Sequence, residues 1–458
     1  MYAHSFFLMA QWQVKGLQLF AALSLLIILH ELGHFVFARL FKTRVEKFYL
    51  FFDFLFPFGN VLNFSLFKKT KGDTTYGIGW FPLGGYVKIA GMVDESMDKD
   101  QLALPPQPWE YRSKKAWQRT LIMLGGIIVN VLVAIIIYVG IFKYWGESYL
   151  PLQEMKYGIQ VDSVGYKLGL RNGDMIMALD GKPVSKMNEV TKGILLHNAK
   201  TIQVKRAGAL TDVTVPSGTI RSMVKAKSLF ATPVIPMVVD SCSSGSFGYS
   251  IGLRNGDTIR KLNGEPFADI SKFNEKKQHL AGQPVVLTVV HAGGDTALLS
   301  GVLPKDKVFG FRTVSPEQLF HFKDVEYSMG AAIARGVRFT GEQFVDYWYQ
   351  LKLLFTSKEI KASESVGGIG TFASQFPGEF DWHAFWMFTA FISIILAFMN
   401  LLPIPGLDGG YVIFLIWEMI TGRKVSDKVM EVATTIGLVL LLGLMLYANG
   451  MDIVKALR

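Results

Sequence analysis

Four apolar segments constrain the fold of this 458-residue chain more than any other feature of its sequence. Each is long enough, or nearly so, to cross the ~30 Å hydrocarbon core of a membrane as a helix. Half of the residues are hydrophobic, yet 18% are charged, which is too many for a bundle of membrane helices alone. We therefore expect membrane helices combined with a soluble part. The four segments are Leu17 to Leu40, Leu121 to Phe142, Phe385 to Leu402 and Val429 to Tyr447.

The first apolar segment contains an HExxH motif, in which His30 and His34 flank Glu31. Residues four apart share one face of a helix, so both imidazoles can bind one zinc ion while Glu31 accepts a proton from the attacking water. Such a short match also occurs by chance, and buried histidines can be ordinary polar groups of a core. Three ionisable side chains in hydrocarbon are costly, however, which favours a functional site. Because this segment has no evident cleavage site, we expect it to remain in the mature protein.

A catalytic zinc ion takes three protein ligands and leaves one position for water, so a third ligand is needed. Leu40 stands where metzincins have a further histidine, while Glu46 and Asp53 follow the end of the predicted helix. A better candidate is Asp408, in the sequence NLLPIPGLDGG of residues 400–410 at the end of the third apolar segment. Its prolines break the helix and its glycines permit close backbone approach. The alternative is that Asp408 is an ordinary turn residue at a helix end.

Basic residues near the apolar segments predict how the chain crosses the membrane. By the positive-inside rule, such clusters mark the cytoplasmic side. The long segment 143–382 and both chain ends then lie on the opposite side, although Lys455 and Arg458 argue weakly against this for the C-terminal end. The formal net charge of +10 is explained by this topology, so we expect no nucleic acid partner. The clusters are Arg39, Lys42, Arg44 and Lys47; Arg112, Lys114, Lys115 and Arg119; and Arg423, Lys424 and Lys428.

The long segment between the second and third apolar segments contains an internal repeat. The sequence GLRNGD occurs at residues 169–174 and again at 252–257, followed by LDGKP at 179–183 and LNGEP at 262–266. Asn-Gly and Asp-Gly pairs favour tight turns, and β-branched runs such as Val285 to Val290 predict strands. Two copies of one β-rich domain are expected. The single cysteine, Cys242, excludes an intramolecular disulfide, so packing alone must hold this part together.

The GLRNGD and LNG pattern resembles PDZ domains of bacterial membrane and envelope proteases. PDZ domains capture an extended peptide at a sheet edge, often holding its terminal carboxylate with backbone N–H groups. Tyr157, Gly158 and Ile159 stand where related domains carry the carboxylate-binding turn, whereas the second copy has Pro236 there, which lacks an N–H donor. This alignment makes the first copy the better candidate for binding peptide C-termini. The alternative is that both copies are spacers that only restrict access.

HExxH together with NxxPxPxLDG closely resembles the site-2 protease family of intramembrane zinc metalloproteases, and the two PDZ-like copies resemble its bacterial RseP group. The resemblance covers nearly the whole chain. It implies one zinc ion held by His30, His34 and Asp408, with Glu31 as general base and Asn400 contacting the substrate. The sequence GGIIVN of residues 125–130 falls where relatives often have GPxxN, with Ile127 in place of proline, which puts a local helix kink in doubt.

The segment from Thr75 to Met92 predicts a β-hairpin between the first two membrane helices, because glycines alternate with strand-forming residues. In the family this region is a membrane-associated β element, whose exposed edge can pair with an unwound substrate. The resemblance thus implies substrate contacts at Gly84, Gly85 and Tyr86. The alternative is an ordinary cytoplasmic hairpin. The aromatic-rich stretch from Tyr327 to Leu354 has helical periodicity and predicts either an interfacial helix or a helix packed on the PDZ-like copies.

The predicted fold class is a multi-pass α-helical membrane protein of about four transmembrane helices, with a membrane-associated β-hairpin and two tandem β-rich PDZ domains. Residues 1–145 form the first part of the membrane core and 383–458 its second part. The PDZ-like copies occupy 146–225 and 226–315, and an amphipathic linker with an interfacial helix occupies 316–382.

The resemblance implies regulated intramembrane proteolysis in a bacterial inner membrane. Expected substrates are single-span membrane proteins, such as anti-sigma factors, and remnant signal peptides. PDZ domains on the periplasmic side would exclude bulky substrates until a site-1 protease has trimmed them, and the active site would lie near the cytoplasmic side. A catalytically silent PDZ-bearing scaffold is the main alternative, but a structural metal site has no use for Glu31. A transporter fits poorly, since the sequence has no inverted repeat.

Overall fold

The computed structural model describes residues 2–55, 62–82, 84–92, 105–226, 229–267, 269–306, 308–356 and 367–457. Position 83 of the predicted hairpin and positions 357–366 of the predicted linker lie outside these ranges. The chain forms two compact units. The membrane unit comprises Met1–Gly146, Glu326–Trp348 and Ser365–Arg458, and the insertion unit comprises Glu147–Val325 and Tyr349–Glu364.

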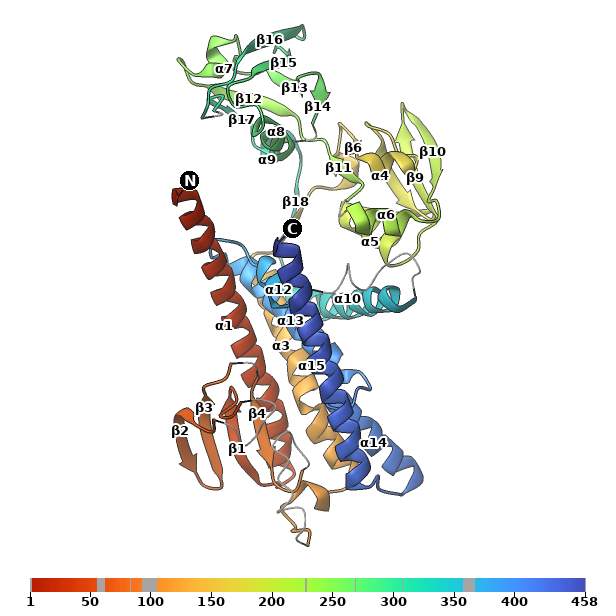
Figure 1. The fold of residues 1–458 in the computed structure, drawn as a ribbon. Helices are drawn as coiled ribbons and strands as arrows, with labels where there is room; N and C mark the ends of the chain where they lie inside the picture. The colour runs from red at the N-terminus through yellow and green to blue at the C-terminus, as the bar shows by residue number, and fades with distance from the viewer. Residues whose placement is uncertain are drawn as a thin grey trace. The chain divides into compact units, whose positions relative to one another are not determined.

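Within the described residues, four helices of the membrane unit are long and apolar enough to span a bilayer, in agreement with the four apolar segments. They belong to α1, α3, α13 and α15; α1 and α13 both pack against α3, and α15 runs in a similar direction (Figure 1). The spanning parts are Gln11–Leu40, Ala116–Tyr144, Trp382–Leu401 and Lys428–Leu457. The helices of this unit are α1 (Tyr2–Leu40), α3 (Ala116–Tyr144), α10 (Met329–Thr356) as far as Trp348, α12 (Ile369–Ser374), α13 (Trp382–Leu401), α14 (Asp408–Thr421) and α15 (Asp427–Leu457), with a 3₁₀ turn at Tyr111–Ser113.

Glycines bring α1 and α3 into backbone contact beside the HExxH motif. A Cβ atom added to Gly33 would lie 2.2 Å from the carbonyl oxygen of Gly125, and one added to Gly125 would lie 2.6 Å from that of Gly33. Small residues permit such close crossing of membrane helices. At a second crossing, a Cβ on Gly437 of α15 would lie 1.5 Å from the carbonyl oxygen of Pro405, so α15 also touches the segment before α14. We infer that both crossings help to define the geometry of the site.

A four-stranded sheet packs beside the C-terminal half of α1 (Figure 1). Its strands are β1 (Val45–Leu50), β2 (Ser65–Lys71), β3 (Thr74–Gly79) and β4 (Tyr86–Ile89), in the spatial order β2-β3-β1-β4. The predicted hairpin over 75–92 is therefore wrong: β3 and β4 do not pair with each other, because both pair with β1, which lies between them. β1 runs parallel to β3 and antiparallel to β4, which leaves β4 as an edge strand.

The part of α10 within the membrane unit packs against α3 and α13, which bears out its expected helical character. A Cβ on Gly336 would lie 2.6 Å from a side-chain atom of Val139, so α10 and α3 cross closely. The rings of Phe339 and Tyr138 meet edge to face with centroids 4.8 Å apart, and Phe344 lies 5.1 Å from Phe398. In Figure 1, α10 runs across the direction of α3 and α13.

The segment Glu147–Val325 of the insertion unit begins and ends with paired strands, since β5 (Glu147–Tyr149) is antiparallel to β18 (Lys323–Val325). The first copy contains β6 (Ile159–Val161), α4 (Ser163–Lys167), β7 (Met175–Leu179), β8 (Lys182–Pro183), α5 (Met187–Leu195), β9 (Thr201–Arg206), β10 (Ala209–Thr214), α6 (Thr219–Ala226) and β11 (Ala231–Pro233), after a 3₁₀ turn at Leu152–Glu154. The second contains β12 (Met237–Cys242), α7 (Phe247–Ser250), β13 (Thr258–Leu262), β14 (Glu265–Pro266), α8 (Ile270–Lys277), β15 (Pro284–Val290), β16 (Thr296–Val302) and β17 (Phe311–Thr313), followed by α9 (Pro316–Leu319).

Each copy is closed by its last strand, which pairs with its first: β11 with β6, and β17 with β12. This pairing places the boundary between the copies after Pro233 rather than at residue 225. Each copy has its own hydrophobic core, one centred on residues such as Leu170 and Ile202, the other on Leu253 and Leu287.

Backbone hydrogen bonds align the two copies and correct the alignment made from sequence. Ile159 N–H donates to the carbonyl of Asp174 at 2.9 Å, and Val239 N–H donates to that of Asp257 at 2.7 Å. Val239 is therefore the counterpart of Ile159, so Pro236 does not stand opposite Gly158 or Ile159. In addition, Gly158 N–H donates to the carbonyl of Met155 at 2.9 Å. In this structure the N–H groups of Gly158 and Ile159 are both engaged within the copy, so neither is available to a peptide carboxylate.

The aspartate of each GLRNGD sequence is buried and bound to a different cation in the two copies. Asp174 forms a bidentate pair with Arg206, with both distances 2.8 Å. Asp257 instead binds Nδ1 of His291 at 2.8 Å. The hydrogen bond to Asp257, with the charges of Asp257 and Asp295, raises the pKa of His291 above its ordinary value of 6.5. The second copy thus has a titratable partner where the first has a permanent cation.

We expect the second copy to lose stability as pH rises, while the first does not. A group whose pKa is raised in the folded state stabilises that state fully at pH values below its ordinary pKa. This stabilisation is lost as the pH rises through the raised pKa. Hydrogen exchange corrected for intrinsic rates would show weaker protection of β15 at pH 8.5 than at pH 5.5, with β9 unchanged. His291→Arg should remove this difference. Equal pH dependence in both copies, or its persistence in His291→Arg, would contradict the prediction.

Candidate metal centre

His30, His34 and Asp408 form a compact group of possible metal ligands in the membrane unit. Nε2 of His30 and Nε2 of His34 each lie 3.3 Å from Oδ2 of Asp408, and the two Nε2 atoms are 3.3 Å apart. The histidines share one face of α1, as their spacing predicts. Asp408 is the first residue of α14, far away in the sequence. The structure therefore brings the three predicted ligands together.

The segment between α13 and α14 places Asp408 against α1. Gly406 adopts φ +94°, a conformation that favours glycine. A Cβ on Gly409 would lie 2.4 Å from the carbonyl oxygen of Leu402, and one on Gly410 would lie 2.5 Å from that of Ile404. The chain thus folds tightly back on itself where the LDGG sequence begins α14, which explains why two successive glycines follow Asp408.

The three side chains fit a tetrahedral metal ion. Ligand atoms about 2.0–2.1 Å from such an ion lie about 3.3 Å from one another, which is the separation of all three atoms here. Oδ2 of Asp408 is buried and has no hydrogen-bond partner in the described part of the protein. Gly126 leaves room for the imidazoles, since its Cβ would lie 2.4 Å from a ring atom of His30 and 2.6 Å from Nε2 of His34.

Both imidazoles are oriented through their second nitrogen. Nδ1 of His34 lies 2.9 Å from the carbonyl oxygen of Ile122, which accepts its proton and turns Nε2 toward Asp408. Nδ1 of His30 lies 3.1 Å from the side-chain amide of Asn130, a fully buried residue whose Oδ1 has no partner among the described residues. An imidazole that binds a metal through Nε2 carries its proton on Nδ1, and turning the Asn130 amide over lets Oδ1 accept that proton. Asn130 then holds His30 as an outer partner of a metal ligand.

We expect Asn130→Ala to weaken binding of a divalent metal about 10- to 100-fold, the usual effect of losing such an outer partner. Asn130→Asp, which keeps an acceptor oxygen, should restore most of the affinity. Ser393→Ala is a matched control, because Ser393 donates to the backbone oxygen of Asn130 and not to its side-chain amide. Competition with a chelator of known affinity measures all three variants. Equal losses in Asn130→Ala and Ser393→Ala would show that the effect is one of packing.

Glu31 lies in the same cavity as the three possible ligands. The cavity has a volume of about 190 Å³. Glu31 and Val87 of β4 both line this cavity, and the backbone N–H of Val87 lies near the Glu31 carboxylate. A Cβ on Gly85 would lie 2.8 Å from Ile27 and 3.5 Å from Glu31, so the start of β4 lies directly against α1. The cavity is lined by His30, Glu31, His34, Phe54, Gly85, Tyr86, Val87, Ile89, Met92, Met123, Asn400, Gly406, Leu407, Asp408, Tyr411 and Thr434.

Most of the residues singled out in the sequence meet in this cavity. Asn400, Gly85 and Tyr86 line it together with Glu31 and the three possible ligands. Gly84 is not among the lining residues, and its Cβ would lie 2.7 Å from the ring of Phe52. Tyr157, Gly158 and Ile159 belong to the insertion unit.

Other cavity residues were not identified from the sequence. Phe54, Met92, Met123 and Thr434 come from separate parts of the chain and carry no motif. Tyr411 follows Asp408 by three residues, so helical periodicity could have placed both on one face. Asn130 ends the sequence GGIIVN, which was interpreted only for its effect on the helix. A polar asparagine in an apolar helix is itself a sign of a functional site.

Comparison with known proteins agrees with this geometry. The model of peptidase family M50 matches residues 18–444. Protease RseP of Yersinia pestis is 29% identical over 464 residues, covering 93% of this chain and 96% of the relative. A Vibrio cholerae protein with zinc metalloprotease in its name is 28% identical over 460 residues, covering 93% and 95%. The regulator of sigma E protease of Haemophilus influenzae is 26% identical over 463 residues, covering 95% and 97%. The chain therefore belongs to peptidase family M50, the site-2 proteases, and is a metalloendopeptidase.

Proposed function

We propose that this protein is an intramembrane zinc protease that cleaves the transmembrane segments of single-span membrane proteins. The observation that carries the proposal is the common 3.3 Å separation of the ligand atoms of His30, His34 and Asp408, with Glu31 in the same cavity. This cavity lies among helices that are apolar and long enough to span a bilayer. Two imidazoles and one carboxylate suit zinc, and zinc metalloprotease appears in the name of a relative.

The protein's own residues supply the proton transfers and position the substrate. A zinc ion held by His30, His34 and Asp408 would act as a Lewis acid toward the scissile carbonyl and acidify a water molecule. Glu31 takes a proton from the water as its oxygen bonds to the carbonyl carbon, then gives that proton to the amide nitrogen as the C–N bond breaks. Asn400, on the cavity wall, has an amide able to hydrogen-bond the substrate backbone. Such a site requires an open position for substrate, which a structural metal site lacks.

The edge strand β4 is the surface that we assign to the unwound substrate. Peptide bonds within a helix are shielded by their own hydrogen bonds, so a transmembrane substrate must become extended before hydrolysis. An edge strand has backbone groups that can pair with such a segment. β4 is terminal in its sheet, and Val87 brings it into contact with Glu31. A substrate paired with β4 would therefore pass directly over the catalytic residues.

We assign peptide capture in the insertion unit to the last strands of the two copies rather than to Tyr157, Gly158 and Ile159. β11 and β17 are terminal strands of their sheets, and each is directly preceded by a residue with positive φ, Phe230 and Gly310. In the second copy a cavity of about 170 Å³ is lined by Thr313 at the end of β17, by Val314 directly after it, and by Ile270 at the start of α8. A strand edge facing a helix is the arrangement that PDZ-type capture uses. The second copy is therefore the better candidate.

The inserted copies also suggest a size filter on the side opposite the cytoplasm, in a bacterial inner membrane. A substrate with a bulky external domain would enter only after a site-1 protease had trimmed it. The Haemophilus relative is named a regulator of sigma E protease, which makes an anti-sigma factor the substrate class to test first.

The decisive experiment compares two single-span substrates with the same transmembrane segment, one with and one without a folded external domain. Purified protein in detergent should cleave the short substrate, and the long one at least about tenfold more slowly, because access decides the rate. Removal of zinc by a chelator should stop cleavage, and added zinc should restore it. Failure to cleave any short substrate with zinc bound would contradict proteolysis, whereas equal cleavage of both substrates would contradict the size filter alone.

A further inference from the structure

A second cavity, which we call the cationic cavity, lies next to the catalytic one. It has a volume of about 250 Å³ and is formed by residues directly after β4, the segment leading into α3, α14 with the segment that follows it, and the start of α15. Three cations and one carboxylate are among its lining residues. It is lined by Gly91, Met92, Pro106, Tyr111, Arg112, Arg119, Tyr411, Phe414, Leu415, Glu418, Lys424, Val425 and Met430.

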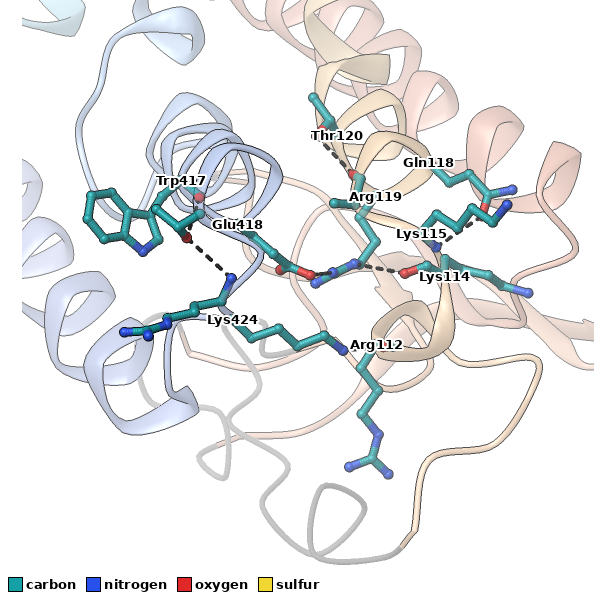
Figure 2. A network of polar contacts seen from close by, with 12 residues as sticks. Arg112, Lys114, Lys115, Gln118, Arg119, Thr120, Trp417, Glu418 and Lys424 are labelled. Carbon is teal, nitrogen blue, oxygen red and sulfur yellow. Dashed lines mark hydrogen bonds and ion pairs between the residues drawn. The ribbon is translucent and has the colours of Figure 1, made fainter.

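The cations of this cavity differ in how they are already bound. The guanidinium of Arg119, which is largely buried, is paired with Glu418 of α14, and this pair links α3 to α14 (Figure 2). Arg112 is paired with Glu110. Lys424 instead donates to the backbone oxygen of Arg112 at 3.3 Å, and within the described part of the chain no carboxylate pairs with it. Among the described residues the cavity therefore has an excess of positive charge, and Lys424 is the cation whose charge can bind a ligand.

The cationic cavity continues the path of a substrate from the catalytic cavity. Met92 and Tyr411 line both cavities and form the wall between them. β4 leads from one to the other, because Val87 contacts Glu31 while Gly91 and Met92 border the cationic cavity. A strand advances about 3.3 Å per residue, so a substrate paired with β4 would bring a residue about four to six positions from the scissile bond to this cavity.

We propose that the cationic cavity is a specificity subsite that binds an acidic side chain of the substrate, with Lys424 as its direct partner. This inference rests on the proposed function and deepens it by naming a substrate feature. Charge complementarity favours an anionic ligand, and the shared wall with the catalytic cavity favours a peptide over a lipid headgroup. The Arg119–Glu418 pair holds the cavity walls together, and the excess charge gives the cavity its preference. Cleavage would therefore depend on a charged residue at some distance from the scissile bond.

The test scans one aspartate through positions two to eight on either side of the cleaved bond of a single-span substrate, with asparagine at the same position as the reference. In the wild type, aspartate at one position should raise kcat/KM about tenfold over asparagine. Lys424→Glu should abolish or reverse this preference, and lysine at that substrate position should restore cleavage by Lys424→Glu. Arg423→Glu is the matched control, since this exposed neighbour carries the same charge and does not line the cavity, and it should keep the preference.

The neutral asparagine substrates separate this inference from the proposed function. If the wild type cleaves them but no aspartate position is preferred, or the preference survives in Lys424→Glu, the subsite is refuted while proteolysis stands. Equal loss of aspartate and asparagine cleavage in Lys424→Glu would mean that Lys424 is structural and would also refute it. A Lys424 effect that follows the phosphatidylglycerol content of vesicles and ignores substrate charge would assign the cavity to a lipid headgroup and overturn the proposal.

Discussion

Glu31→Gln should abolish detectable cleavage of a single-span substrate while leaving zinc bound. Glutamine keeps the size of the side chain but cannot accept a proton, so the transfers from water and to the leaving nitrogen are lost. General acid–base catalysis typically contributes about 10²- to 10⁴-fold to a rate. None of the three atoms that fit a metal ion belongs to Glu31, so metal content should remain near one zinc per chain. Single-turnover cleavage and elemental analysis of the same preparation measure both properties.

Glu342→Gln is a suitable control for this variant. Glu342 lies in α10 of the membrane unit, and its carboxylate pairs with Arg335. The same chemical change there should leave cleavage near the wild-type rate. If Glu31→Gln cleaved as fast as the wild type, another base would be required or the activity would come from a contaminant. If it lost zinc together with activity, Glu31 would have to be assigned to metal binding instead.

Asp408→Asn should remove the metal and, with it, all cleavage. The neutral amide is a much poorer ligand for zinc than the carboxylate, and it leaves the two histidines without a charged partner. The loss of zinc affinity should exceed the about 10- to 100-fold effect expected for an outer partner such as Asn130. Zinc content after dialysis, and titration against a chelator, measure this loss. Because Glu31→Gln should retain zinc, the two variants separate the loss of the base from the loss of the metal.

Asp452→Asn tests whether such a loss is specific. Asp452 of α15 accepts hydrogen bonds from the backbone and hydroxyl groups of Thr371 and is not one of the three possible metal ligands. Its replacement should loosen the contact between α15 and α12 without releasing zinc. Full zinc occupancy in Asp408→Asn would contradict the proposed ligand set, and zinc loss in both variants would indicate a general disturbance of the membrane unit.

The possible metal ligands were predictable because they depend on local spacing and on chemistry that is costly in a membrane. Helical periodicity alone places His30 and His34 on one face. An aspartate between helix-breaking prolines and a pair of glycines, at the end of an apolar segment, leaves few other interpretations. The apolar segments likewise predicted the four candidate spans, since only a helix satisfies its own backbone hydrogen bonds in hydrocarbon.

Strand pairing was not predictable in the same way. The alternation around Tyr86 and Val87 correctly predicted a strand, but it did not identify β1 as the strand that pairs with it. Period-two patterns describe one strand at a time, whereas pairing depends on hydrogen bonds to distant segments. The same limit made the sequence alignment of the two copies in the insertion unit wrong. Their backbone hydrogen bonds to Asp174 and Asp257 show that Ile159 corresponds to Val239.

The sequence by itself determined that this is a membrane protein with an HExxH helix, a distant aspartate and a duplicated β-rich insertion. The tertiary structure alone decided the surroundings of the site: Asn130 against His30, edge strand β4 against Glu31, and the cationic cavity beyond Met92 and Tyr411. The physical reason is the distance along the chain over which each effect acts. Helix periodicity, turn chemistry and the cost of charge in hydrocarbon act on neighbouring residues, whereas cavities and hydrogen-bond partners arise only when segments hundreds of residues apart pack together.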